Sequence, residues 1–177
     1  MSRWMVVGAL ALVCGVSVYW TEPWIQAPRV PIRSILTEAQ IRNDVQYQAN
    51  LHAARAVLRG CGAKIPEFAA QAAIKNRIPV RIVAADIVVE SGCNPRAVSR
   101  AGAVGLMQVM GSIHRVPRKR LLNPEENVNI GTRILAQNIH RYGYHNGLAR
   151  YFGITAGSDA SAAYATKVLS VAYRENQ

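Results

Sequence analysis

The chain has 177 residues, half of them hydrophobic, and a formal net charge of +11. This length favours one folded domain with attached segments over two full domains. The basic excess indicates an anionic partner, such as nucleic acid, anionic lipid or an acidic cell-wall polymer. Because the sequence has neither zinc-ligand spacing nor the aromatic strand pattern of RNA-binding domains, nucleic acid is not the expected partner.

Residues 1–22 predict a membrane anchor or an export signal. Arg3 precedes an uncharged stretch from Trp4 to Trp20, about the minimum length of a membrane-spanning helix. The positive flank favours a cytoplasmic N-terminus and an exported remainder. A cleaved signal peptide is the alternative, and the lack of a good small-x-small cleavage site favours an uncleaved anchor. The prolines of residues 23–35 predict an extended linker, so the folded domain is expected over residues 36–177.

The domain is predicted to be all-α or α-dominated, because strand-like alternation is scarce. Thr37 and Gln40 have capping-box spacing before a run of apolar residues that ends at Gly60. Apolar residues at helical spacing in this first helix are Ile41, Val45, Leu51, Ala54 and Leu58. Further helices are expected at about 66–76, 79–90, 123–142 and 161–176. The segment 79–90 is apolar nearly all round, so we expect it to be central and buried.

Glu90 stands at the C-terminal end of this apolar helix. Burial and the negative end of the helix dipole both raise the pKa of a carboxyl group there, which suits a general acid. Taken alone, a solvent-exposed residue at a helix end is the better interpretation of Glu90. Asp86, one turn earlier, either shares its face and raises its pKa further, points to solvent, or pairs with Arg81 or Arg55.

The residues that follow favour catalysis. The stretch "ESGCNPRAVSRAGAVGLMQ", residues 90–108, resembles the pattern E-S-x-x-N-P-x-A-x-S-x-x-G-A-x-G-L-M-Q of the soluble-lytic-transglycosylase-like family. A second family block, Pro-Glu-Asn-hydrophobic-x-x-Gly, is similar to residues 124–131. A third, Leu-Ala-x-x-Tyr-Asn-x-Gly, is partly matched by residues 148–157, and the closing Tyr-x-x-x-Val-Leu by residues 164–169.

This resemblance implies a goose-type-lysozyme-like helical fold with a cleft for peptidoglycan glycan strands. It also implies cleavage of the bond between N-acetylmuramic acid and N-acetylglucosamine by one glutamate. Glu90 would protonate the glycosidic oxygen and then accept the proton of the muramic acid C6 hydroxyl, which attacks C1 and leaves a 1,6-anhydro product. The second carboxylate of most glycosidases is then unnecessary.

The resemblance also implies a substrate-binding set. Its members are Ser99, Met107, Gln108, Met110, Asn127 and Tyr151. The family tyrosine matched by Tyr151 hydrogen-bonds the acid and orients it. Phe152 departs from the family pattern, which has asparagine there, and so removes a polar group from the cleft. Gly102 and Gly105 are expected to adopt positive φ and to let a sugar approach the backbone, or simply to form a loop.

Three cysteines allow at most one intramolecular disulfide. Cys61 and Cys93 lie at the ends of adjacent predicted helices in the exported part, so we expect them to pair. Cys14 would stay in the membrane segment; exchange between Cys14 and Cys93 is the alternative. The four histidines, His52, His114, His140 and His145, lack metal-ligand spacing, and no cofactor is expected.

The predicted function is therefore that of a peptidoglycan lytic transglycosylase that opens the wall locally. It is expected on the periplasmic face of the bacterial inner membrane, or exported, or associated with a phage virion. Its expected partners are glycan strands, the inner membrane, and a secretion, conjugation or phage-ejection assembly. A non-catalytic peptidoglycan-binding scaffold and a lysozyme-type hydrolase are the alternatives.

Overall fold

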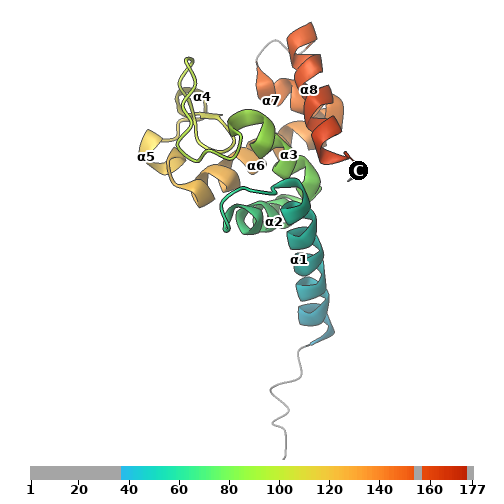
Figure 1. Ribbon diagram of the computed structural model, residues 1–177. Coiled ribbons are helices and arrows are strands. Elements are labelled where there is room, and N and C mark those ends of the chain that lie inside the picture. Colours follow the sequence, from blue (N-terminus) through green and yellow to red (C-terminus); the bar gives the residue numbers. More distant parts are fainter. Residues whose placement is uncertain (1–36, 154–156, 175–177) are drawn as a thin grey trace, which may run out of the picture. The chain divides into compact units, whose positions relative to one another are not determined.

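The computed structural model describes residues 37–153 and 157–174, which belong to one compact unit beginning at residue 36 (Figure 1). The predicted membrane segment, 1–22, and the predicted linker, 23–35, lie outside the described residues. Among the helices of the described ranges, none has both the length and the hydropathy that a bilayer span requires.

The described unit consists mainly of helices, which confirms the α-dominated prediction. The helices are α1 (Glu38–Val57), α2 (Ile65–Asn76), α3 (Val80–Ser91), α4 (Gly111–His114), α5 (Arg118–Leu121), α6 (Pro124–Tyr142), α7 (Tyr144–Phe152) and α8 (Asp159–Ala172). Two short strands, β1 (Ala103–Val104) and β2 (Val109–Met110), pair antiparallel between α3 and α4. This small hairpin was not predicted, because two-residue strands are too short to show an alternating pattern.

Helix α1 begins at the predicted capping box. The Thr37 hydroxyl accepts a hydrogen bond from the Gln40 amide, and the Gln40 side chain accepts one from the Thr37 amide. The predicted apolar face of α1 is only half used, since Ile41 and Val45 are 49% and 63% exposed. Only the later turns of α1 are buried, where the helix packs against α2 and α3, while its first turns project away from these helices (Figure 1).

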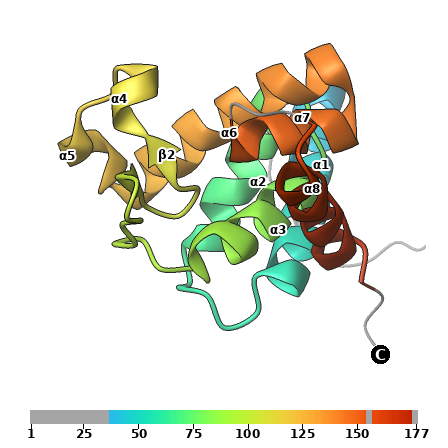
Figure 2. The ribbon, with the colours of Figure 1, turned by 90° about the horizontal axis from the view of Figure 1, so that it is seen from above.

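Helix α3 is the central helix that its sequence predicted. Pro79 precedes it in an extended conformation, and its side chains from Ile82 to Ile87 are buried. It packs against α1, α2 and α8 (Figure 2). The helix ends at Gly92, whose φ of 57° is left-handed and suits glycine. This placement sets Glu90 in the last turn, where a buried helix reaches the surface of the domain.

Helix α6 begins as predicted, with Asn123 as its N-cap and Pro124 in its first turn. Helix α7, which packs against it, was not predicted because Gly147 interrupts its apolar pattern. A Cβ at position 147 would lie 2.6 Å from the Ile139 Cα, so the glycine is what lets the two helices approach. The last helix, α8, runs from Asp159 to Ala172 rather than over 161–176, because the Ser158 side chain caps it earlier.

Candidate active site

Glu90 is held by a tyrosine from another helix. Its Oε1 atom lies 2.7 Å from the Tyr164 hydroxyl oxygen, and Tyr164 comes from α8, which packs against α3. Tyr164 is buried and Glu90 is partly exposed. The acid is therefore fixed on the protein side and accessible on the other.

Asp86 reaches the same hydroxyl from one turn earlier on α3. Its Oδ1 atom lies 2.6 Å from the Tyr164 oxygen, and the residue is 0% exposed. The sequence left solvent and two arginines open as alternatives. The structure pairs Arg55 with Glu67 and directs Arg81 to the Ala172 carbonyl oxygen. Asp86 thus shares the face of Glu90.

The electrostatics of this cluster favour neutral groups. Burial raises the pKa of Glu90, and the hydrogen bond from Tyr164 opposes this rise. Burial first, and the charge of Glu90 second, raise the pKa of Asp86 well above its usual range. Burial and the two carboxyl groups also raise the pKa values of Tyr151 and Tyr164, so both phenols stay protonated. The fold therefore favours the protonated form of Glu90 more than water does, which is the direction that a general acid requires.

Tyr151 does not bind the acid, and that expectation from the resemblance is wrong. Its hydroxyl donates to the Met107 carbonyl oxygen at 2.7 Å, while Tyr164 makes the contact with Glu90. The sequence offered a signal for Tyr164, because it opens the closing family block and stands on the apolar side of the last helix. The packing of α8 onto α3, which brings Tyr164 to Glu90, could not be predicted from the sequence.

Phe152 covers the tyrosine that holds Glu90. Its ring stacks on the ring of Tyr164, with the centroids 4.8 Å apart and the planes 27° apart, and the residue is half exposed. The position where the family pattern has an amide therefore carries an aromatic contact to the acid's partner. The departure from the pattern alters the support of Glu90 as well as the polarity of the cleft.

Asn127 and Met107, both expected to contact substrate, are fully buried, so the structure contradicts this role. The Asn127 oxygen accepts from the Met107 amide at 2.9 Å. Its nitrogen donates to the Val104 carbonyl at 2.8 Å and to the Leu121 carbonyl at 2.9 Å. These three bonds tie the β1–β2 hairpin to α5 and α6. Asn127 therefore shapes the loop beside the site instead of binding a ligand.

The two loop glycines have different roles. Both adopt the predicted positive φ, 87° at Gly102 and 82° at Gly105. A Cβ at Gly102 would meet nothing within 4 Å. At Gly105 it would lie 2.6 Å from the Asn127 Cγ and 2.7 Å from the Leu121 carbonyl oxygen. The space beside the Gly105 Cα is thus filled by Asn127 and Leu121.

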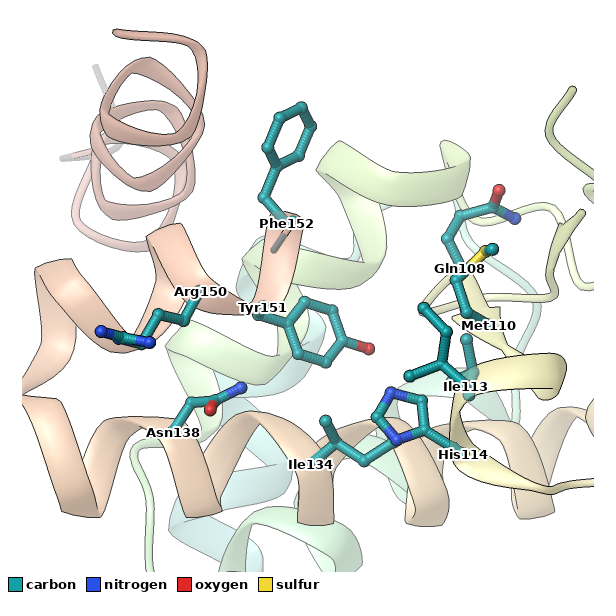
Figure 3. A pocket seen from close by; sticks show the side chains of 11 residues that line it. Gln108, Met110, Ile113, His114, Ile134, Asn138, Arg150, Tyr151 and Phe152 are labelled. Atoms are coloured by element: carbon teal, nitrogen blue, oxygen red, sulfur yellow. The ribbon is translucent and has the colours of Figure 1, made fainter. Parts of the chain in front are cut away.

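A cavity of about 260 Å³ lies between the segment from Gln108 to His114, helix α6 and the end of α7 (Figure 3). Side chains around it include Gln108, Met110, Ile113, His114, Tyr151 and Phe152. Glu90 does not line this cavity, and the two are connected through the stacked rings of Phe152 and Tyr164. The structure thus brings three predicted residues, Gln108, Met110 and Tyr151, to one cavity.

Gln108 presents its side chain in a fixed orientation. Its amide nitrogen donates to the Gly105 carbonyl at 2.9 Å and to the Ala97 carbonyl at 3.3 Å. Ser99, the remaining predicted residue, lies outside the cavity lining and accepts a hydrogen bond from the Ala103 amide at 3.0 Å. Both side chains stabilise the loop between α3 and α4, and both stay partly exposed.

Cys61 and Cys93 form a disulfide, with their Cα atoms 5.5 Å apart. It joins the segment after α1 to the turn after α3, three residues beyond Glu90. Closing a loop of this length stabilises a domain by about 3–4 kcal/mol in the chain-entropy model. No group of three or more metal-ligating side chains gathers within residues 37–153 and 157–174.

Known proteins resemble this chain in sequence and in fold. Residues 67–171 match the family described as "Transglycosylase SLT domain". A membrane-bound lytic murein transglycosylase C of Photorhabdus laumondii is 32% identical over 114 residues, covering 56% of this chain and 32% of that protein. A transglycosylase of Enterobacteria phage PRD1 is 38% identical over 77 residues, covering 42% of this chain and 29% of that protein.

A solved structure of an inactive mutant of the lytic transglycosylase Slt from Pseudomonas aeruginosa has the same fold. It superposes with a TM-score of 0.51 at 20% identity, over 76% of this chain and 28% of that one. The chain spans about a third of the length of the curated relatives it matches. Because the family match covers more than half of the sequence, the chain belongs to the transglycosylase SLT domain family.

Proposed function

We propose that this protein is a peptidoglycan lytic transglycosylase. It cleaves the bond between N-acetylmuramic acid and N-acetylglucosamine and forms 1,6-anhydro-muramic acid ends. The observation that carries this function is Glu90, a carboxyl group with a raised pKa at the open end of a buried helix, held by Tyr164. This is the arrangement that a single general acid requires.

Glu90 acts first as the acid and then as the base. Tyr164 donates its hydrogen bond to Oε1, which leaves Oε2 to carry the proton that the glycosidic oxygen receives. The resulting carboxylate then takes the proton of the muramic acid C6 hydroxyl as that oxygen attacks C1. Burial favours the protonated acid before the first step, and the Tyr164 hydrogen bond stabilises the carboxylate between the steps.

Among the described residues, the second carboxyl group that shares the hydrogen-bond partner of Glu90 is Asp86, and it is not on the accessible side of this site. Two-carboxylate glycosidases place one carboxyl group on each side of the scissile bond. Asp86 is 0% exposed and its Oδ1 atom contacts the Tyr164 hydroxyl, so it reaches neither a sugar nor an attacking water. Among the described residues, no acidic side chain lines the neighbouring cavity. This favours intramolecular attack by the C6 hydroxyl over the lysozyme-type alternative.

The cavity lined by Gln108, Tyr151 and Phe152, which the Phe152–Tyr164 stacking links to Glu90, is the proposed saccharide subsite. Tyr151 and Phe152 offer aromatic rings against which a sugar can pack, and Gln108 and Arg150 offer polar groups. The net charge of +11 suits a wall polymer that bears carboxylates. We place the catalytic unit on the periplasmic side of the inner membrane, or exported, where it opens the wall for a secretion, conjugation or phage machine. One relative is a membrane-bound transglycosylase and another comes from Enterobacteria phage PRD1, and both support this context.

Digestion of purified peptidoglycan followed by mass spectrometry tests this function. Wild-type protein should release anhydro-muropeptides, and Glu90→Gln should release none while it keeps its helical circular dichroism spectrum. Glu125→Gln, the same substitution at an exposed position on α6, is the matched control and should remain active. Reducing ends instead of anhydro ends would show a hydrolase, and binding without product would show a scaffold. Cleavage retained in Glu90→Gln would refute the assignment of the acid.

A further inference from the structure

We propose that Asp86 is a positioning residue that stays protonated and directs the Tyr164 hydroxyl proton toward Glu90. This inference deepens the proposed function and rests on it. It concerns the line of three side chains in which Tyr164 lies between two carboxyl groups, at 2.6 Å from Asp86 and 2.7 Å from Glu90.

The number of protons decides how these contacts are made. A phenol hydroxyl has one proton to donate, and an ionised carboxylate can only accept. Tyr164 therefore cannot donate to both partners, and one of the two carboxyl groups must donate to the phenol oxygen. At these distances both contacts are hydrogen bonds only if at least one carboxyl group carries a proton.

Asp86 is the carboxyl group that keeps this proton. It is fully buried, its Oδ2 atom has no hydrogen-bond partner among the described residues, and Arg81 and Arg55 are directed elsewhere. An ionised Asp86 would leave a buried charge without a cation, which is strongly unfavourable. The titratable groups that face it are Glu90 on its own helix, Tyr164 on α8 and Tyr151 on α7, none of which is a cation.

The direction of the chain of hydrogen bonds follows. Asp86 donates to the Tyr164 oxygen, and Tyr164 donates to Glu90 Oε1. This order suits Glu90 in both of its catalytic states, because Oε1 accepts whether or not Oε2 is protonated. In the reverse order, an ionised Asp86 would accept the hydrogen bond that the Tyr164 hydroxyl donates. Glu90 would then have to donate its own proton to Tyr164, away from the substrate.

Two substitutions at Asp86 test this inference. Asp86→Leu fills the site but removes the donor, so we expect kcat for anhydro-muropeptide release to fall about tenfold with KM little changed. Asp86→Asn keeps a neutral donor at the same place, so it should restore most of this loss. The alkaline limb of its pH profile, which reports ionisation of Glu90, should stay at the wild-type position. Asp44→Asn, on the exposed part of α1, controls for the loss of one charge.

An ionised Asp86 gives the opposite pattern. Asp86→Asn would then remove a negative charge close to Glu90, lower its pKa, and move the alkaline limb to lower pH. Such a shift would overturn the inference. So would an equal loss of kcat in the asparagine and leucine variants, or wild-type kcat in both. If Asp86→Leu does not fold, the pH profile of Asp86→Asn alone decides.

Infrared spectroscopy provides a readout that does not depend on turnover. At neutral pH the wild-type protein should show the carbonyl stretches of protonated carboxyl groups. Asp86→Asn should lose the component of the fully buried Asp86 carboxyl group, and Glu90→Gln should retain that component. A spectrum from which Asp86→Asn removes no carbonyl component would overturn the inference even if the enzyme is active. An Asp86-dependent component in a protein without enzymatic activity would instead leave Asp86 protonated and refute the proposed function.

Discussion

Phe152 and Tyr164 stack with their ring centroids 4.8 Å apart, so the acid's hydrogen-bond partner is itself held by an aromatic ring. Tyr164 is buried, and Phe152 is the half-exposed member of the pair. The position at which the sequence departs from the family pattern is therefore coupled to the catalytic centre.

Replacing Phe152 by alanine should lower kcat about fivefold, because a stacked aromatic pair contributes about 0.5–1.5 kcal/mol beyond its buried area. Water that reaches Tyr164 and Glu90 should also lower the pKa of Glu90 and move the alkaline limb of the activity profile to lower pH. The pH dependence of anhydro-muropeptide release measures both effects. Phe152→Tyr, which keeps the ring, is the control. An alanine variant that matches the control at every pH would show that the stacking has no catalytic role.

Tyr164→Phe and Tyr151→Phe should have different effects, because only Tyr164 contacts Glu90. We expect Tyr164→Phe to lower kcat about tenfold or more and to raise the pKa of Glu90, since the hydrogen bond that stabilises its carboxylate is lost. Tyr151→Phe should cost about 1 kcal/mol of stability through the lost bond to Met107 and affect kcat less. Steady-state kinetics and urea unfolding separate the two. A larger loss of kcat in Tyr151→Phe would contradict the assignment.

Gly105→Ala should destabilise the domain by about 2–4 kcal/mol, because a Cβ there would overlap Asn127 and the Leu121 carbonyl. Gly102→Ala is the matched control. It has a similar φ of 87° but open space, so only the left-handed backbone penalty of about 1–2 kcal/mol applies. Urea unfolding followed by circular dichroism measures both. An equal loss of unfolding free energy in the two variants would mean that the loop can move away from Asn127 without further destabilising the domain.

The free energy of unfolding should fall as the pH rises from the usual carboxyl pKa of about 4 toward the raised pKa values of Asp86 and Glu90 in the folded protein. Asp86 and Glu90 have raised pKa values in the folded protein, so in this range the folded state binds more protons than the unfolded state. Their contribution is complete below the usual carboxyl pKa and is lost as the pH rises toward the folded values. Asp86→Asn should flatten this dependence more than Glu90→Gln, because Asp86 is fully buried. An unchanged slope in Asp86→Asn would contradict this prediction.

The sequence predicted correctly those features of the fold that depend on interactions between residues close together in the chain. The capping box at Thr37, the buried helix that ends near Glu90 and the N-cap at Asn123 are all present, since each depends on neighbours in sequence. Helix α7 was missed because Gly147 weakens the pattern, and the need for glycine comes from α6 packing against it. That requirement cannot be read from α7 alone.

The position of Glu90 at the end of a buried helix, and the raised pKa that follows from burial, could be predicted from the sequence, while its catalytic role stays a proposal. Other parts of the candidate site could not be predicted in this way. The predictions were wrong where they depended on which group a side chain contacts. Asn127 binds backbone carbonyls and Tyr151 binds Met107, although both belong to blocks that resemble the family pattern. Tyr164 and Asp86 acquire their roles only when α8 packs on α3, a contact between residues 78 positions apart. The pattern of residues along the chain does not predict this contact between α3 and α8.

Glu90 and Asp86 are held by a phenol, and within the described ranges neither forms an ion pair with lysine or arginine. Added salt screens interactions between exposed charges far more than those inside such a neutral, buried cluster. The attraction between a polycationic chain and an anionic wall depends on exposed charges. For the proposed wall substrate, ionic strength should therefore change KM and leave kcat nearly constant, so that the salt concentration alters substrate binding and not the rate of the chemical step.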